Sequence, residues 1–208
     1  VHPLPLLNPG KVGCVGLNYY AHARELDKEV PEEPLLFLKP GSAVIDHGQL
    51  IRIPAQSAEV HYEGELAVVM GGLCRNVPEE EAAGYVLGYT CANDVTARDL
   101  QRKDVQYSRA KGFDTFCPLG PGIETGIEPL KEARITTRVN DQMVQSGLVS
   151  DMIVSPLALV AFISEVMTLH PGDVILTGTP PGVGVLKSGD QVCVDIEGIG
   201  RLCNPVIG

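Results

Sequence analysis

Three acidic side chains in the sequence could together hold a divalent metal ion. Glu63 and Glu65 stand two residues apart in a segment that continues as an apolar, strand-like stretch. Residues two apart in a strand project from the same face, about 6–7 Å from each other, so both carboxylates can converge on one ion. Asp94 lies near the end of the next strand-like stretch, where a loop can turn it toward a neighbouring strand. Such an all-oxygen site suits Mg²⁺, and also Mn²⁺ or Ca²⁺, better than zinc.

The same spacing also fits the solvent-facing side of an edge strand. Glu59 and His61 lie at alternate positions that continue from Glu63 and Glu65, so all four side chains could form one longer polar face of a strand. Two unpaired carboxylates on a buried face would be costly, which favours a bound cation only if the face is buried. The spacing alone leaves both interpretations open.

A second pair of residues could perform acid–base chemistry. His22 and Glu25 are three apart in a stretch that predicts a short helix over residues 19–26, with Asn18 as its N-cap. A carboxylate that accepts from one imidazole nitrogen leaves the other nitrogen free to take a proton from water. The alternative for this pair is a solvated surface contact, and for Lys111 a solvated loop position.

The elements that must position these residues are mostly short strands. They outnumber the predicted helices about two to one, which indicates an α+β class with a β-rich core. Asn140-Asp141 predicts a hairpin turn, and Ser155-Pro156 opens the clearest helix. The strands are expected at residues 12–15, 35–38, 50–53, 65–70, 86–95, 134–139, 142–145, 174–177, 191–196 and 201–206. The segment 35–38 is expected to be a buried strand, and the last two segments to form a hairpin.

Composition and charge limit the classes of function. The chain has 208 residues, with 26 acidic and 16 basic side chains and a formal charge of −10. No basic cluster is present, which argues against nucleic acid as a partner. The most apolar segment, residues 157–167, falls well short of the roughly 20 residues that a membrane span needs. The first residues lack the pattern of a secretory signal, and the cysteines are expected to be reduced, so we expect a cytoplasmic protein.

The cysteines are expected to be reduced core residues. None forms a CxxC pair, and their flanks are apolar and strand-like, so neither a zinc site nor a disulfide framework is predicted. They are found at positions 14, 74, 91, 117, 193 and 203.

Four segments, in order and spanning nearly the whole chain, resemble the fumarylacetoacetate hydrolase family. They are HYEGELAVV (61–69), NDVTARDLQ (93–101), RAKGFD (109–114) and PGDVILTGTP (171–180). The resemblance implies a mixed β-sheet roll with a few short helices, in a protein that is commonly a homodimer. It also implies that Glu63, Glu65 and Asp94 are the metal ligands. We expect one catalytic domain over residues 1–208, without the separate N-terminal domain of longer members.

The resemblance further assigns roles to residues around the metal. It implies that His22 and Glu25 form a catalytic dyad on a lid helix, within about residues 16–30, and that Lys111 stabilises a developing enolate. It places Arg98 and Gln101 near the substrate, although Arg98 could equally pair with Asp99 or Asp94. It implies that Gly178 and Thr179 contact the carboxylate of the substrate.

The implied substrates are small 2-oxo or β-dicarbonyl acids. The expected reaction is cleavage of a carbon–carbon bond, by an acylpyruvate-type hydrolase or an oxaloacetate-type decarboxylase. The alternative within the family is isomerisation and decarboxylation of 2-hydroxyhepta-2,4-diene-1,7-dioate and its precursor (5-carboxymethyl-2-hydroxymuconate). An alternative from another class is a non-catalytic protein of the same fold that binds a small acid.

Overall fold

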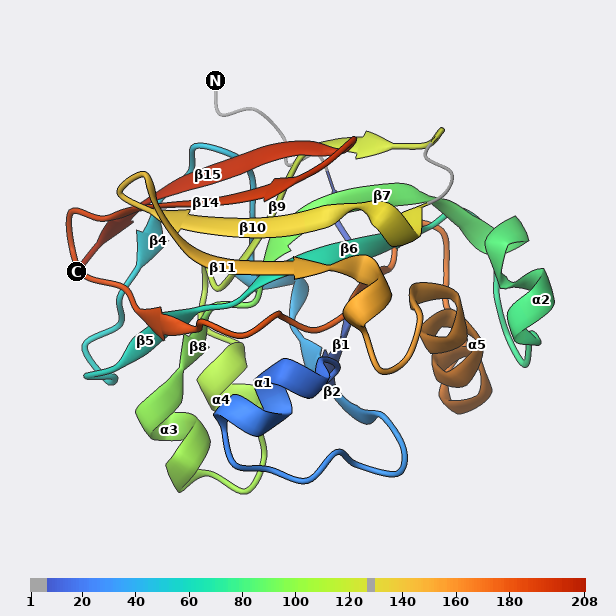
Figure 1. The fold of residues 1–208 in the computed structure, drawn as a ribbon, viewed down its shortest axis with the longest axis horizontal. Helices are drawn as coiled ribbons and strands as arrows, with labels where there is room; N and C mark the ends of the chain where they lie inside the picture. The colour runs from blue at the N-terminus through green and yellow to red at the C-terminus, as the bar shows by residue number, and fades with distance from the viewer. Residues whose placement is uncertain (1–6, 127–129) are drawn as a thin grey trace.

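The computed structural model describes residues 7–126 and 130–208, and the largest sheet formed by these residues has seven strands (Figure 1). The pairing of its central strands is antiparallel, except that β1 runs parallel to β12. In spatial order the sheet contains β2 (Leu35–Lys39), β1 (Val12–Gly16), β12 (Val174–Leu176), β6 (Gly64–Met70), β7 (Val86–Asn93), β9 (Cys117–Glu124) and β3 (Val44–Ile45).

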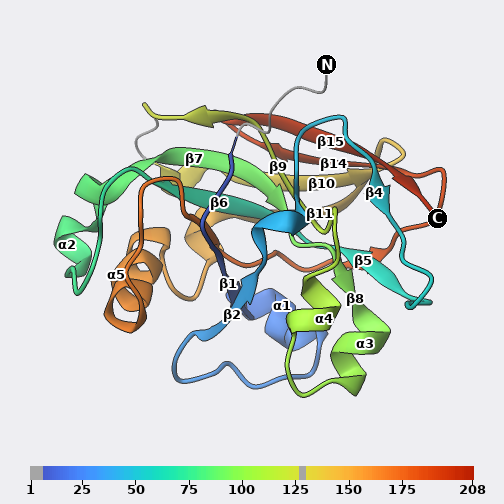
Figure 2. The same cartoon turned by 180° about the vertical axis from the view of Figure 1, so that it is seen from behind.

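A second sheet lies over β6 and β7, as both views show (Figures 1 and 2). Its strands, in spatial order, are β11 (Gln142–Leu148), β10 (Arg134–Val139), β14 (Gln191–Ile196), β15 (Gly200–Ile207) and β4 (Ile51–Arg52). A small sheet beside it contains β13 (Gly184–Val185), β5 (Val60–Tyr62) and β8 (Thr96–Ala97).

The helices are short and gather in two places. Near β5 and β8 lie α1 (Tyr20–Glu25), α3 (Arg98–Lys103) and α4 (Ser108–Lys111), while α2 (Glu79–Ala82) and α5 (Pro156–Val166) lie together at the other end of the sheet (Figure 2). The 3₁₀ turns are η1 (Gly41–Ala43), η2 (Ala83–Tyr85), η3 (Leu130–Glu132) and η4 (Val149–Asp151). None of the helices in the described ranges has the length and apolarity needed to cross a membrane.

Both faces of β6 are buried, which explains why its sequence is an almost continuous apolar run. On one face Leu66 packs in a cluster with Ile135 of β10, between the two sheets. On the other face Ala67 and Val69 pack against residues of β1, β9 and β12. The acidic residues before and within this strand therefore project from a fully buried element.

The architecture confirms the prediction of an α+β, β-rich fold. The hairpin at Asn140-Asp141 joins β10 to β11, and both turn residues have positive φ angles, of 51° and 66°. The hairpin at the end of the chain is formed by β14 and β15. The clearest helix is α5, where the hydroxyl of Ser155 accepts a hydrogen bond from the Ala158 amide at 3.1 Å.

The prediction that every cysteine is reduced is wrong for one pair. The register of β14 and β15 sets Cys193 directly opposite Cys203, with their Cα atoms 4.1 Å apart, and a disulfide joins them. Directly opposed residues of an antiparallel pair bring their side chains close together. The remaining cysteines are buried free thiols: Cys14, Cys74, Cys91 and Cys117.

The prediction that Asn18 caps α1 is also wrong. The cap position is Tyr19, and no side chain caps this helix. The side-chain Nδ2 of Asn18 instead donates to the backbone carbonyls of Thr177, at 2.8 Å, and Val154, at 2.9 Å. Its side-chain Oδ1 accepts from the backbone amide of Val154. Asn18 therefore ties the start of the α1 segment to two distant loops.

The strand β2 is only partly buried, which corrects the expectation of a buried strand. Leu35 is 46% exposed and Leu38 is 47% exposed. The reason is its place in the sheet, because β2 is an edge strand that pairs with β1 alone among the described strands. Its last residue, Lys39, is nevertheless buried.

Candidate active site

The three carboxylates predicted to bind metal lie together in the structure. Each of Glu63, Glu65 and Asp94 is buried, and each offers an oxygen within 4.8 Å of the others. Glu63 precedes β6 and Asp94 follows β7, and the antiparallel pairing of these strands brings the two positions side by side. The Asp94 amide donates to the Glu63 carbonyl at 2.8 Å, which fixes the two backbones.

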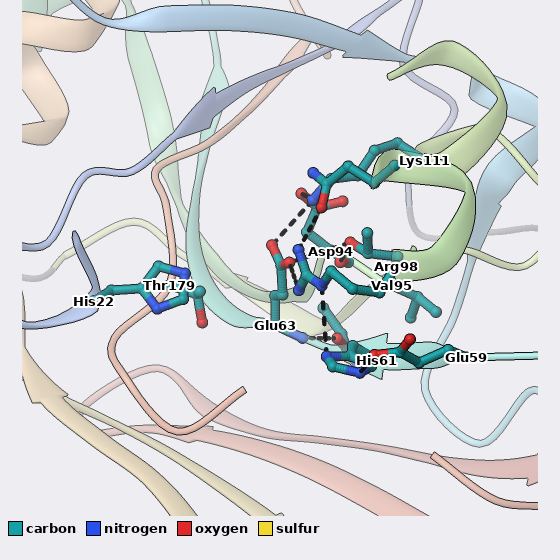
Figure 3. A network of polar contacts seen from close by, with 12 residues as sticks. His22, Glu59, His61, Glu63, Asp94, Val95, Arg98, Lys111 and Thr179 are labelled. Carbon is teal, nitrogen blue, oxygen red and sulfur yellow. Dashed lines mark hydrogen bonds and ion pairs between the residues drawn. The ribbon is translucent and has the colours of Figure 1, made fainter. Parts of the chain in front are cut away.

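Two buried lysines neutralise part of this cluster. Lys111, at the end of α4, donates to Glu63 at 3.0 Å and to Asp94 at 2.5 Å (Figure 3). Lys39, at the end of β2, donates to the other oxygen of Asp94 at 2.6 Å and to the Val95 carbonyl at 3.1 Å. Sequence reasoning missed Lys39. The feature that could have identified it is a lysine that ends an apolar strand directly before Pro40.

Arg98 starts α3 and faces the same cluster. Its guanidinium donates to Glu63, and also to Gln101 at 2.6 Å (Figure 3). The alternative in which Arg98 pairs with Asp99 or Asp94 is wrong. Asp99 accepts instead from the hydroxyl of Ser57 at 2.6 Å.

These contacts give the carboxylates opposite electrostatic environments. Burial alone would raise the pKa of Glu63, but Lys111 and Arg98 outweigh it and hold that pKa well below its usual range. Burial would lower the pKa of Lys111, but Asp94 and Glu63 outweigh it and hold that pKa above its ordinary value. Burial raises the pKa of Glu65 well above its ordinary value, and the charges of Asp94 and Glu63 raise it further.

The donor set fits a divalent cation at Glu65. No ion pair joins this carboxylate to Lys39, Lys111 or Arg98, which contact its neighbours in the described part of the chain. One of its oxygens accepts from the Gly178 amide at 2.7 Å. Three converging carboxylates with an unneutralised member are the chemistry of a hard-cation site.

His22 and Glu25 form the expected dyad on α1. The Nδ1 atom of His22 lies 2.9 Å from a Glu25 oxygen, and His22 is buried. Glu25 also accepts from the Gly182 amide at 3.0 Å, so it ties α1 to the loop between β12 and β13. Because Nδ1 is engaged, Nε2 is the nitrogen of His22 that can exchange a proton in the cavity.

The loop after β12 lies beside the His–Glu dyad. Gly178 has a φ angle of +93°, and a Cβ there would lie 2.7 Å from the Cβ of Asn18. The hydroxyl of Thr179 donates to the Gly64 carbonyl at 2.8 Å, and it accepts from Gln145 at the same distance. Figure 3 shows Thr179 beside His22, across from the ion-pair network.

A cavity of about 100 Å³ lies between these groups. Most of the residues selected from the sequence line it: His22, Glu63, Glu65, Arg98, Gln101, Lys111 and Thr179. The others, Glu25, Asp94 and Gly178, each contact one of these wall residues. Among the other wall residues, Leu26 and Lys28 fall within the lid region expected at about residues 16–30. Sequence reasoning missed Leu35, Phe37 and Tyr107.

Comparison with known proteins identifies relatives over almost the whole chain. Residues 11–207 match the family model described as fumarylacetoacetate (FAA) hydrolase C-terminal. A mitochondrial oxaloacetate tautomerase of Xenopus laevis is 45% identical over 214 residues, which cover 98% of this chain and 67% of that protein. An uncharacterised protein of Archaeoglobus fulgidus is 58% identical, over 98% of this chain and 81% of its own length.

Solved structures share the fold. A 5-carboxymethyl-2-hydroxymuconate delta-isomerase from Mycobacterium smegmatis is 51% identical, with a TM-score of 0.91, and the match covers 97% of this chain and 80% of that one. A fumarylpyruvate hydrolase from Pseudomonas aeruginosa, in complex with Mn²⁺ and pyruvate, is 33% identical with a TM-score of 0.91, over 97% and 91% of the two chains. Three of these four relatives are named as enzymes: a tautomerase, an isomerase and a hydrolase.

Proposed function

Because the chain belongs to the fumarylacetoacetate hydrolase family, we propose that it is a divalent-metal-dependent enzyme that forms the enolate of a small 2-oxo acid. Oxaloacetate is the substrate that we propose, and keto–enol tautomerisation is the reaction. The observation that carries the proposal is the single small cavity on which a carboxylate triad, a His–Glu dyad and a buried lysine meet.

In this proposal Glu63, Glu65 and Asp94 hold the metal, with Mg²⁺ or Mn²⁺ as the ion. The bound ion would act as a Lewis acid that polarises the 2-oxo carbonyl. Support comes from Glu65, which none of the site's described basic residues contacts as an ion pair, and from the Mn²⁺ and pyruvate in the related hydrolase.

His22 is the proposed base. Glu25 holds its Nδ1 at 2.9 Å, so Nε2 removes a proton from the carbon beside the 2-oxo group. The electron pair of that C–H bond forms the C=C bond of the enolate while the carbonyl π pair moves to the oxygen, and the ammonium group of Lys111 stabilises the negative charge there. Water then gives a proton to the enolate oxygen, and His22 returns its proton to water, which completes the tautomerisation. Loss of the distal carboxylate as CO₂ reaches an enolate by the same electron movement, which makes decarboxylation a side reaction of this site.

Size and charge favour oxaloacetate over larger substrates. A cavity of about 100 Å³ is well below the roughly 300–1,000 Å³ of sites for drug-sized ligands. The three carboxylates are equal in number to the positive charges of Lys39, Lys111 and Arg98, so a divalent ion would give this group of residues a net charge of about +2. A dianion with four carbon atoms satisfies both conditions.

Hydrolysis of an acylpyruvate is a second candidate, and the His–Glu dyad favours it. His22 could instead activate water for attack on a second carbonyl, after which the carbon–carbon bond breaks and the same enolate leaves. The two candidates differ in whether water is consumed.

The test compares metal-stripped protein with protein given Mg²⁺ or Mn²⁺. Enol absorbance follows oxaloacetate tautomerisation, CO₂ release follows decarboxylation, and acetate formation follows acetylpyruvate hydrolysis. We expect metal-dependent tautomerisation that falls by about 10²–10⁴-fold in His22→Gln, the usual contribution of a positioned base. The matched control is His170→Gln, which removes an exposed histidine of a second i,i+3 His–acid pair.

Each outcome separates the candidates. Acetate formation without tautomerisation would replace the first candidate with the second. Conversion of none of the substrates, with metal bound, would contradict both and favour a protein that binds a small acid without catalysis.

A further inference from the structure

We infer that Lys28 binds the second carboxylate of the substrate and thereby selects 2-oxo dicarboxylates over monocarboxylates, an assignment that rests on the proposed function of this cavity. Lys28 lines the cavity, on the segment that follows α1.

The charge of Lys28 is not matched by a carboxylate. The other lysine and arginine on the wall, Lys111 and Arg98, both contact Glu63. For Lys28, by contrast, the described ranges contain no ion pair and no side-chain hydrogen bond. A wall cation without a partner is the group that an incoming anion can engage without breaking an existing pair.

The backbone of Lys28 is held to the helix that carries the proposed base. After α1 the chain turns at Asp27, whose φ angle is +50°. The Lys28 amide donates to the Ala23 carbonyl at 3.0 Å, and the Asp27 amide donates to the Arg24 carbonyl at 3.2 Å. These two bonds form a Schellman motif. The position of Lys28 is therefore coupled to that of α1 and His22.

Lys28 lies at the exposed rim of the cavity. Leu26 and Leu35, which also line the cavity, are exposed and apolar, so neither offers a carboxylate a polar partner. Lys28 is also the only basic residue between positions 25 and 38. The acidic residues of that segment are Glu25, Asp27, Glu29, Glu32 and Glu33.

The two ends of the cavity thus differ in what they recognise. The carboxylate triad and Lys111 face the reacting 2-oxo end of the substrate. Lys28 follows α1, and in this assignment it binds the distal end. A small cavity between two such ends fits a short diacid.

The test uses two substrates that differ in one charge, oxaloacetate and its 4-monoester, in which the distal carboxylate is blocked. Lys28→Met should lower kcat/KM for oxaloacetate about fivefold, mainly through KM, which is the upper range for an ion pair at an exposed site. The same substitution should change kcat/KM for the monoester by less than about twofold. Lys28→Arg should retain most of the preference for the diacid, since it keeps the charge. Lys103→Met, which removes an exposed lysine of α3, is the matched control.

Equal losses with both substrates, or no loss with either, would overturn the assignment while leaving the proposed function intact. A wild-type protein that converts neither compound would overturn both.

Discussion

Replacing Lys39 with methionine removes a buried charge from the centre of the candidate site. Lys39 is 1% exposed, and its Nζ atom lies 2.6 Å from a carboxylate oxygen of Asp94, which is equally buried. Methionine keeps an unbranched stem of similar length, so the change removes the ammonium group with little loss of packing. We expect Lys39→Met to fold and to be markedly less stable than the wild-type protein.

The magnitude follows from the contacts that are lost. Removal of one partner from a buried ion pair typically costs about 3–5 kcal/mol. Lys111 still contacts Asp94 at 2.5 Å, which favours the lower end, while the Val95 carbonyl loses a donor at 3.1 Å. We therefore expect a loss of about 3–4 kcal/mol. For a chain of this size that corresponds to a fall in Tm of roughly 6–16 °C.

The assay is urea and thermal unfolding in EDTA, followed by circular dichroism. The control is Lys131→Met, which removes an exposed lysine and should change stability by less than about 0.5 kcal/mol. Adding Asp94→Asn to Lys39→Met should cost less than the sum of the single changes, because the partner charge is no longer stranded. A loss below about 1 kcal/mol in Lys39→Met, or strict additivity in the double variant, would refute the reasoning.

Three further predictions concern other parts of the molecule. Gly178→Ala should lower the free energy of unfolding in urea by about 2–4 kcal/mol, because the new Cβ would lie 2.7 Å from Asn18 at a residue with a positive φ angle. The control is Gly172→Ala, which has a φ angle of +85° but open space around it and should cost about 1 kcal/mol. Equal losses in the two variants would contradict the clash. Replacing Cys193 and Cys203 together with serine should lower stability by about 2–3 kcal/mol, and reduction should destabilise the wild-type protein but not this variant. Because the pKa of Glu65 is raised, the metal-free native state holds a proton that the unfolded chain releases near pH 4.5. The protonated Glu65 therefore contributes stability that is fully present below pH 4.5 and is lost as the pH rises through the raised pKa. The unfolding free energy in EDTA should therefore decline with pH above 4.5, and saturating Mg²⁺ should remove the decline; parallel curves with and without Mg²⁺ would contradict it.

Local pattern was enough to find the carboxylates and the dyad. The two-residue period of a strand places Glu63 and Glu65 on one face, and the helical period brings His22 to Glu25. What the pattern could not decide was burial, since an acidic strand face and a metal site share the same spacing. The ordered family motifs favour the metal site, and all three carboxylates are buried in the structure.

The missed features all depend on the register between distant segments. Lys39 reaches Asp94 across 55 positions, and their contact exists only because β2 lies beside β1 and close to α4. The Cys193–Cys203 bond likewise follows from the register of β14 and β15, which one slipped residue would abolish. Asn18 carries a helix-cap residue type, but distant carbonyls compete for its side chain.

The cavity has two walls, one formed by the carboxylates and one by α1 with the loop after it. This division suggests how members of one family can catalyse different reactions. The carboxylate wall is built on β6 and β7, where both strand faces are buried and Glu63 is further held by Lys111, so a substitution there disturbs the core as well as the site. The opposite wall is α1 and the loop after it, held to the rest of the chain by the contact from Glu25 to Gly182 and by Asn18. Under the proposed function, the carboxylate wall holds the metal and stabilises the enolate, while the opposite wall supplies the base His22 and, through Lys28, selects the acid. Exchanging residues 26–35 for those of a hydrolytic relative should then change the substrate preference while leaving Mg²⁺ binding intact.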